Sequence, residues 1–192
     1  VNYQLKNGAT NVGSPVAGTG IAISFGNQTS AGTYTVVATN GTTSCTSTMT
    51  GSATISVNPL PTAFTVQGGG AYCSGGSGVE VKLSDSQTGV NYQVQLNGSP
   101  TAEPPVAGTG VAITFGIQTA AGTYTVVATN TTTTCTSAMT GSVAVTINPL
   151  PSVFSVTGGG LFCSGGTGVV VGLSGSQSGV NYPPQLHSVN SA

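Results

Sequence analysis

Apolar and polar residues alternate in short runs along the chain, which is the pattern of half-buried β-strands rather than of helices. In residues 79–83, for example, three apolar side chains point one way and the two charged ones point the other. Turn residues such as Asn97-Gly98 separate the runs. About seven such strands in 90 residues predict an all-β fold of the sandwich type. Further inward positions on this pattern are Val111, Ile113, Phe115, Tyr124, Val126, Ala128, Val143, Val145 and Ile147.

The ten residues AGTYTVVATN occur at positions 31–40 and again at 121–130. They belong to a longer repeat, because residues 15–92 and 105–182 are identical at 55 of 78 positions, about 70%. A repeat of about 90 residues is too long for a solenoid unit and has the length of a whole sandwich domain. The sequence therefore predicts tandem β-sandwich repeats.

The sequence Asn-Pro-Leu-Pro marks the boundary between repeats, because two prolines cannot lie in a central strand and they stiffen a linker. We predict that residues 1–58 are the C-terminal part of one repeat and that 59–148 are a complete repeat. Residues 149–192 are then the N-terminal part of a further repeat with an irregular tail. The linker prolines are Pro59, Pro61, Pro149 and Pro151.

The two incomplete segments would each expose an apolar face and open strand edges, so they need a partner. Either the chain is part of a longer tandem array, or the C-terminal part of one copy completes the N-terminal part of the next. Both arrangements place copies head to tail, and such a contact extends into a fibre when it does not close into a ring.

Charge is scarce, with two basic and three acidic residues in the 192 and a formal net charge of −1. Binding to nucleic acid or to an anionic membrane needs clustered Lys and Arg, so we expect neither. No apolar run approaches the roughly 18 residues of a transmembrane helix, so we expect no membrane insertion. The low net charge also removes repulsion between copies, which favours self-association.

The sequence contains no recognisable catalytic set. His187 is the only histidine, and no nucleophile or paired acid accompanies it. Three acidic residues and four cysteines without a Cys-x-x-Cys pair make a poor metal site. The glycine-rich sequence at 68–76 lacks the Gly-Lys-Ser/Thr ending of a phosphate loop. We therefore expect no enzyme activity, no cofactor and no metal.

The phrase Gly-x-Tyr-x-Val in both repeats resembles strand F of immunoglobulin-like domains, where a tyrosine near the strand start bonds back to the backbone. The resemblance implies this role for Tyr34 and Tyr124. Val36 and Val126 stand where antibody domains carry a core cysteine, and the chain has no tryptophan. The whole repeat, including GGGAYCSGGSGVEV and CTSAMTGS, resembles the tandem immunoglobulin-like repeats of large secreted adhesins and filaments on the surface of type IX-secreting bacteria.

This resemblance implies a structural module of an extracellular filament or adhesin stalk at the cell surface, with copies of itself as partners. The alternative is a carbohydrate- or cell-binding adhesin domain that recognises surface glycans. Exposed aromatic residues in one repeat alone would favour the alternative, whereas the aromatic residues of this chain recur at inward positions.

The resembling repeats carry two cysteines per domain, which implies a disulfide between Cys73 and Cys135. The spacing also allows two pairs across the linkers, Cys45 with Cys73 and Cys135 with Cys163. Disulfides suit an exported β-domain. Four free thiols are the remaining alternative.

Overall fold

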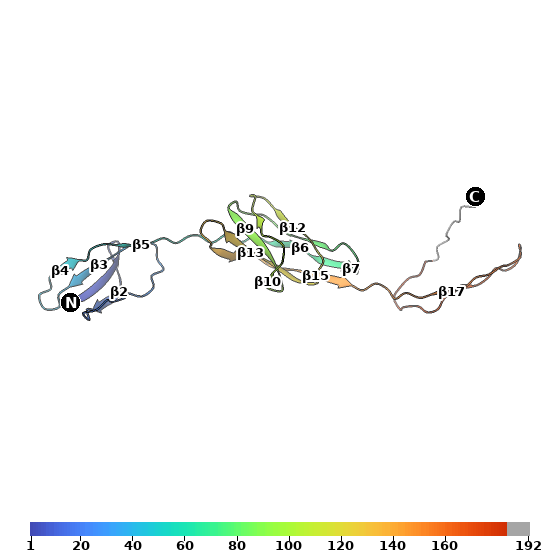
Figure 1. The fold of residues 1–192 in the computed structure, drawn as a ribbon, viewed down its shortest axis with the longest axis horizontal. Coiled ribbons are helices and arrows are strands. Elements are labelled where there is room, and N and C mark those ends of the chain that lie inside the picture. The colour runs from blue at the N-terminus through green and yellow to red at the C-terminus, as the bar shows by residue number, and fades with distance from the viewer. Residues whose placement is uncertain (184–192) are drawn as a thin grey trace. The chain divides into compact units, whose positions relative to one another are not determined.

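The computed structural model describes residues 1–183, whose regular structure consists of β-strands (Figure 1). The all-β prediction is confirmed. The described residues contain no helix that is long and apolar enough to cross a membrane. Contacts group Val1–Thr62 with Thr129–Ser137 in one unit and the rest of the described chain in a second. The predicted irregular tail from residue 184 onward, including His187, lies outside the described residues.

Residues 66–148 form a β-sandwich, here called the central sandwich. One sheet has the strand order β10-β9-β13-β15-β7, with β11 paired to β9 and β14 to β13, and the other has the order β12-β8-β6. Inward side chains of both sheets share one core, in which Val81, Leu83 and Tyr92 are fully buried. The strands are β6 (Val66–Gly68), β7 (Gly70–Cys73), β8 (Val79–Leu83), β9 (Val90–Leu96), β10 (Ser99–Pro100), β11 (Val106–Ala107), β12 (Ile113–Gln118), β13 (Gly122–Asn130), β14 (Thr136–Ala138) and β15 (Val143–Asn148).

The alternation predicted for the inward residues holds in the middle of the strands and fails at two strand ends. Tyr124, in the middle of the sheet, is 1% exposed. Val111 is 63% exposed, because it lies in the loop before β12 rather than in the strand. Ile147 is 42% exposed, because β13 pairs with β15 only as far as Val145. The predictions for Val111 and Ile147 are therefore wrong.

Three consecutive glycines carry the chain from one sheet of the central sandwich to the other. Gly68 ends β6, which pairs with β8, and Gly70 begins β7, which pairs in parallel with β15. The φ angles of the three glycines are 94°, 70° and 124°, a region that other residues rarely adopt. A Cβ on Gly68 would lie 2.1 Å from the carbonyl oxygen of Glu80. The glycine-rich motif is thus a crossover between sheets.

Residues 1–58 form one sheet, the N-terminal sheet, with the strand order β2-β1-β3-β4 and with β5 also paired to β3. Residues 23–28 (ISFGNQ) correspond in the repeat to β12 (ITFGIQ) but form no strand. The neighbour of β12 in its sheet is β8, and residues 1–58 contain no counterpart of β8. A strand-forming sequence is therefore left without a strand to pair with. The strands are β1 (Asn2–Asn7), β2 (Thr10–Ala17), β3 (Gly32–Thr39), β4 (Thr46–Thr48) and β5 (Ala53–Ile55).

Residues 152–173, here called the C-terminal hairpin, contain two paired strands, β16 (Val156–Gly158) and β17 (Val171–Leu173). They correspond to β6 and β8, and the register is the same: Val156 pairs with Leu173 as Val66 pairs with Leu83. The three glycines at the end of β16, residues 158–160, also have positive φ. The local sequence therefore favours the hairpin register and the glycine conformations without the rest of the sandwich.

Replacing Gly68 by Ala is expected to destabilise the central sandwich by roughly 3 kcal/mol, because the new Cβ adds a backbone clash to an unfavourable φ. Gly116→Ala is the matched control: its φ is also positive (76°), but no atom lies within 4 Å of the added Cβ, so the cost is about 1 kcal/mol. Hydrogen exchange of the β9 amides measures both values. Equal effects of the two substitutions would contradict the crossover geometry.

Candidate functional site

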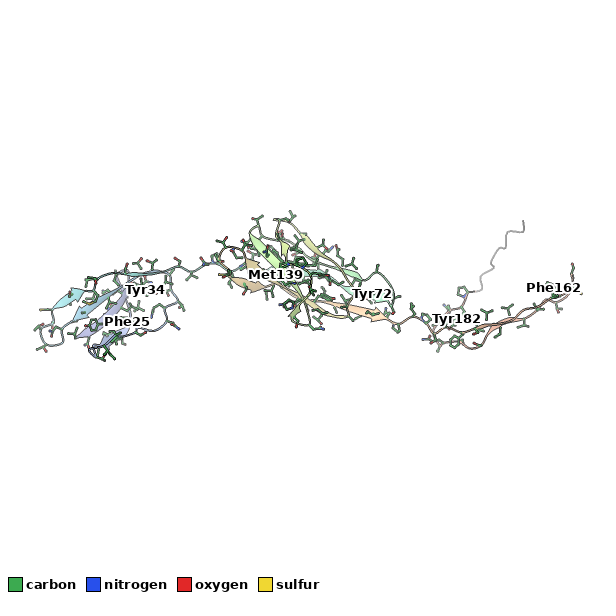
Figure 2. All side chains as sticks on the ribbon, viewed as in Figure 1. Phe25, Tyr34, Tyr72, Met139, Phe162 and Tyr182 are labelled. Atoms are coloured by element: carbon green, nitrogen blue, oxygen red, sulfur yellow. The ribbon has the colours of Figure 1, made fainter. Side chains whose placement is uncertain are left out.

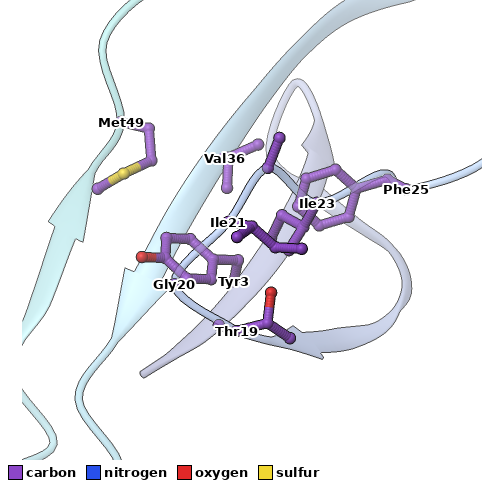
Figure 3. Close-up of a pocket in the computed structure, with 10 residues that line it drawn as sticks. Tyr3, Thr19, Gly20, Ile21, Ile23, Phe25, Val36 and Met49 are labelled. Atoms are coloured by element: carbon purple, nitrogen blue, oxygen red, sulfur yellow. The ribbon is translucent and has the colours of Figure 1, made fainter.

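One side of the N-terminal sheet carries an apolar hollow of about 490 Å³ (Figure 3). Tyr3 of β1, Val36 of β3 and Met49 line it from the sheet, while Ile23 and Phe25 line it from the segment without a strand partner. We call this hollow the open face and define it by Tyr3, Ile21, Ile23, Phe25, Val36 and Met49.

Except for Val111, the counterpart of Ile21, the residues of the central sandwich that correspond to the open face lie in its core. Phe115, the counterpart of Phe25, is 7% exposed, whereas Phe25 is only half-buried. Met139 is 6% exposed and its counterpart Met49 is 36% exposed. The open face is therefore one half of a sandwich core.

The C-terminal hairpin presents the other half of such a core. Val171 and Leu173 are 66% and 38% exposed, while their counterparts Val81 and Leu83 are fully buried. Phe162, which Figure 2 labels near the far end of this segment, is 61% exposed. The sequence alone did not single out these residues, although each lies 90 positions from an inward residue of the complete repeat. That spacing is the signal that identifies them.

Tyr34 and Tyr124 lie near the start of β3 and β13 and are almost completely buried. Each donates a hydrogen bond to the carbonyl oxygen four residues upstream, Tyr34 to Ser30 and Tyr124 to Ala120, both at 2.9 Å. This is the bond that the resemblance to strand F implies. It ties the chain before each strand to the strand itself.

Burial raises the pKa of the Tyr124 phenol above its ordinary value of 10.0, and the nearby Glu103 carboxylate raises it further. The hydrogen bond to Ala120 acts in the opposite direction. Glu103 is held close by Gln118, whose Nε2 donates to its Oε2 at 3.1 Å. The folded domain therefore favours the neutral phenol, which can donate.

The predicted disulfide between Cys73 and Cys135 is not formed, and both are free thiols. Cys73 is opposite Asn148, beyond the start of β13, whereas Cys135 follows the end of β13. The nine residues of β13 alone span roughly 25 Å, while disulfide-bonded residues have Cα atoms within about 7 Å. The pairs across the linkers are not formed either, because Cys45 and Cys163 are also free.

The second linker is short. β15 ends at Asn148, and the amide of Ser152 already donates to Gln177 Oε1 at 2.8 Å, so three residues lie between. Two of the three are prolines, which favour an extended backbone of about 3.1 Å per residue. Of the four linker prolines, Pro59, Pro149 and Pro151 are exposed and Pro61 is buried.

Polar chemistry is sparse in residues 1–183. No three His, Cys, Asp or Glu side chains among them lie close enough to hold a metal ion. Lys82 Nζ and Glu80 Oε2 lie 3.7 Å apart, and both side chains are nearly half exposed, so the pair contributes less than about 1 kcal/mol. The prominent surface features of this part of the chain are apolar faces and strand edges.

No protein-family model matches the chain, and no curated protein matches it. The functional assignment therefore rests on the sequence and the geometry. The relation to immunoglobulin-like surface repeats stays a prediction.

Tyr124→Phe is expected to destabilise the central sandwich by about 1 kcal/mol, because the hydrogen bond to Ala120 is lost. The substitution also changes how the stability of the central sandwich depends on pH. The folded-state pKa of Tyr124 is raised, so the neutral phenol contributes to the free energy of unfolding. This contribution is complete below pH 10 and is lost as the pH rises through the folded-state pKa. Urea unfolding from neutral to alkaline pH should show a decline for the native chain that is smaller for Tyr124→Phe. An unchanged alkaline decline would contradict this assignment.

Because all four cysteines are free, we expect four thiols per chain to react with a thiol reagent in the absence of reductant. Cys135, which is half-buried, should react more slowly than the three exposed cysteines, because thiol reactivity depends on access. A count of two or none, with mass spectrometry locating a disulfide, would contradict the structure.

Proposed function

We propose that the protein is a structural module of an extracellular bacterial filament or adhesin stalk, and that copies associate head to tail. One observation carries the proposal: residues buried in the central sandwich recur, exposed, in the N-terminal sheet and in the C-terminal hairpin. Full burial of an exposed apolar side chain stabilises a contact by about 1.5–3 kcal/mol, and Leu173, which is 38% exposed, can contribute a part of this. The chain therefore has a strong drive to cover these surfaces.

Shortage of charge supports association as well. Five charged residues in 192 leave little repulsion between copies and few charged groups to desolvate at a contact. Exposed strand edges add hydrogen-bond donors and acceptors that pair readily with another strand. Cohesion through backbone pairing and apolar packing is the function that this combination suits.

The repeated architecture supports a mechanical role rather than a catalytic one. The prolines restrict the backbone of the linkers between the segments to extended conformations. The tyrosine hydrogen bonds and the glycine crossover fix each module internally and involve no reactive group. We therefore propose a non-enzymatic protein that acts outside the cell, in agreement with its resemblance to secreted surface repeats.

Sedimentation of the purified chain is expected to show assembly that grows with protein concentration and changes little with salt. Between about 0.01 M and 1 M salt the screening length falls from about 30 Å to 3 Å, so a charge-driven contact would change strongly. An apolar, hydrogen-bonded contact should change its apparent affinity by less than about threefold. Compact particles that stay monomeric at all concentrations would contradict the proposal, and a glycan-binding screen would then test the adhesin-domain alternative.

A further inference from the structure

We propose that the central sandwich carries a binding site for a primary alkylammonium group, with the carboxylate of Glu103 as its charged partner. The site is a hollow of about 390 Å³ beside the turn between β12 and β13. All of its lining residues belong to the central sandwich, and the site is independent of the proposed association between copies. Its apolar walls are formed by Leu96, Pro100, Ile117 and Ala120.

A buried amide fixes the position of the carboxylate. Gln118 is 5% exposed, and its Nε2 donates to the carbonyl oxygen of Phe115 at 2.9 Å. The same nitrogen donates to the Glu103 carboxylate, with Oε2 at 3.1 Å and Oε1 at 3.4 Å. The backbone of Glu103 is held as well, because Gln93 Nε2 donates to its carbonyl oxygen at 3.2 Å. The charged group is therefore in place before a ligand arrives, which lowers the entropic cost of binding.

Glu103 keeps most of its capacity to accept hydrogen bonds. An ionised carboxylate has about four acceptor sites. The amide nitrogen of Gln118 has two hydrogens, and one of them is used by the carbonyl of Phe115, so a single hydrogen is shared between the carboxylate oxygens. Among residues 1–183, the ion pair that forms joins Lys82 to Glu80 and leaves Glu103 without a cationic partner. A cation in the hollow would form charge-assisted hydrogen bonds with this carboxylate.

The N-terminal sheet shows that the carboxylate is not needed to build this part of the fold. Gly13 occupies the position of Glu103 in the repeat, and its carbonyl oxygen accepts the equivalent bond from Gln4 at 3.2 Å. The counterpart of the buried amide, Gln28, donates to the carbonyl oxygen of Phe25 at 2.8 Å. Both glutamine contacts thus form without a charge nearby. The carboxylate of the central sandwich is therefore available for a ligand.

The surroundings of the carboxylate favour an ammonium group on an aliphatic stem. Such a stem, like that of a lysine side chain, packs along apolar surface while its charged end stays with a polar group. Ile117, which is 54% exposed, supplies part of that surface. A guanidinium group favours stacking on an aromatic face. The aromatic residue that lines the hollow, Tyr124, is 1% exposed and offers no such face.

Titration of the full chain with n-butylammonium chloride, followed by ¹H–¹⁵N NMR, tests the site. The amides of residues 117–120 and the side-chain amide of Gln118 should shift in a saturable manner. 1-Butanol, which has the same stem without the charge, should bind at least about tenfold more weakly, because it cannot form the charge-assisted bonds.

The matched substitutions Glu103→Gln and Glu80→Gln test the role of the carboxylate. Glu103→Gln keeps the shape of the side chain and removes its charge, so n-butylammonium should bind at least about tenfold more weakly. Glu80→Gln removes a carboxylate outside the hollow and should change the affinity by less than about twofold. Hydrogen exchange of the β9 amides checks that both variants keep the central sandwich.

Nα-acetyl-lysine methylamide distinguishes the two sources of an alkylammonium group. Binding as tight as that of n-butylammonium, or tighter, identifies the lysine side chain of a partner protein, and weaker binding identifies a free amine. Both results support the site. The inference is wrong if n-butylammonium produces no saturable shift, if 1-butanol binds equally well, or if the two glutamine variants behave alike. None of these results bears on the proposed function, which the sedimentation experiment tests.

Discussion

The fold depends on one strand, β8, which lies between β6 and β12 and contributes two fully buried side chains, Val81 and Leu83, to the core. Its backbone pairs with both neighbouring strands, and its apolar side chains fill the space between the two sheets. Where its counterpart is missing, in residues 1–58, the segment 23–28 forms no strand and the core residues around Phe25 are left open. An apolar sheet face with unpaired edges pairs readily with a further strand.

The chain carries counterparts of both halves of a sandwich core. Its few polar groups hold these parts in shape. Charged groups are almost absent, and the buried hydroxyl groups of Tyr34 and Tyr124 bond to backbone carbonyls. Glycines at the crossover set the chain direction. These features hold each module in shape, and the apolar surfaces that remain support the proposal that copies join one another.

Local patterns in the sequence predicted local structure well. The alternation at 79–83 coincides with β8, and the Asn97-Gly98 turn has φ of 51° and 82°, as a tight hairpin turn requires. Features that depend on distant partners could not be predicted. The parallel pairing of β7 with β15, and hence the positions of Cys73 and Cys135 beyond opposite ends of β13, follows from the crossover at the glycines. Alternation of apolar and polar residues predicts which face of the sheet a side chain lies on. It does not predict which strand pairs with which.

A structure of the assembled chain by electron cryomicroscopy would show whether copies join through the apolar faces of the N-terminal sheet and the C-terminal hairpin. If they do, the side chains of Phe25 and Leu173, which correspond to the buried residues Phe115 and Leu83 of the central sandwich, will be buried between copies. Assemblies in which both apolar faces stay exposed would contradict head-to-tail association through them.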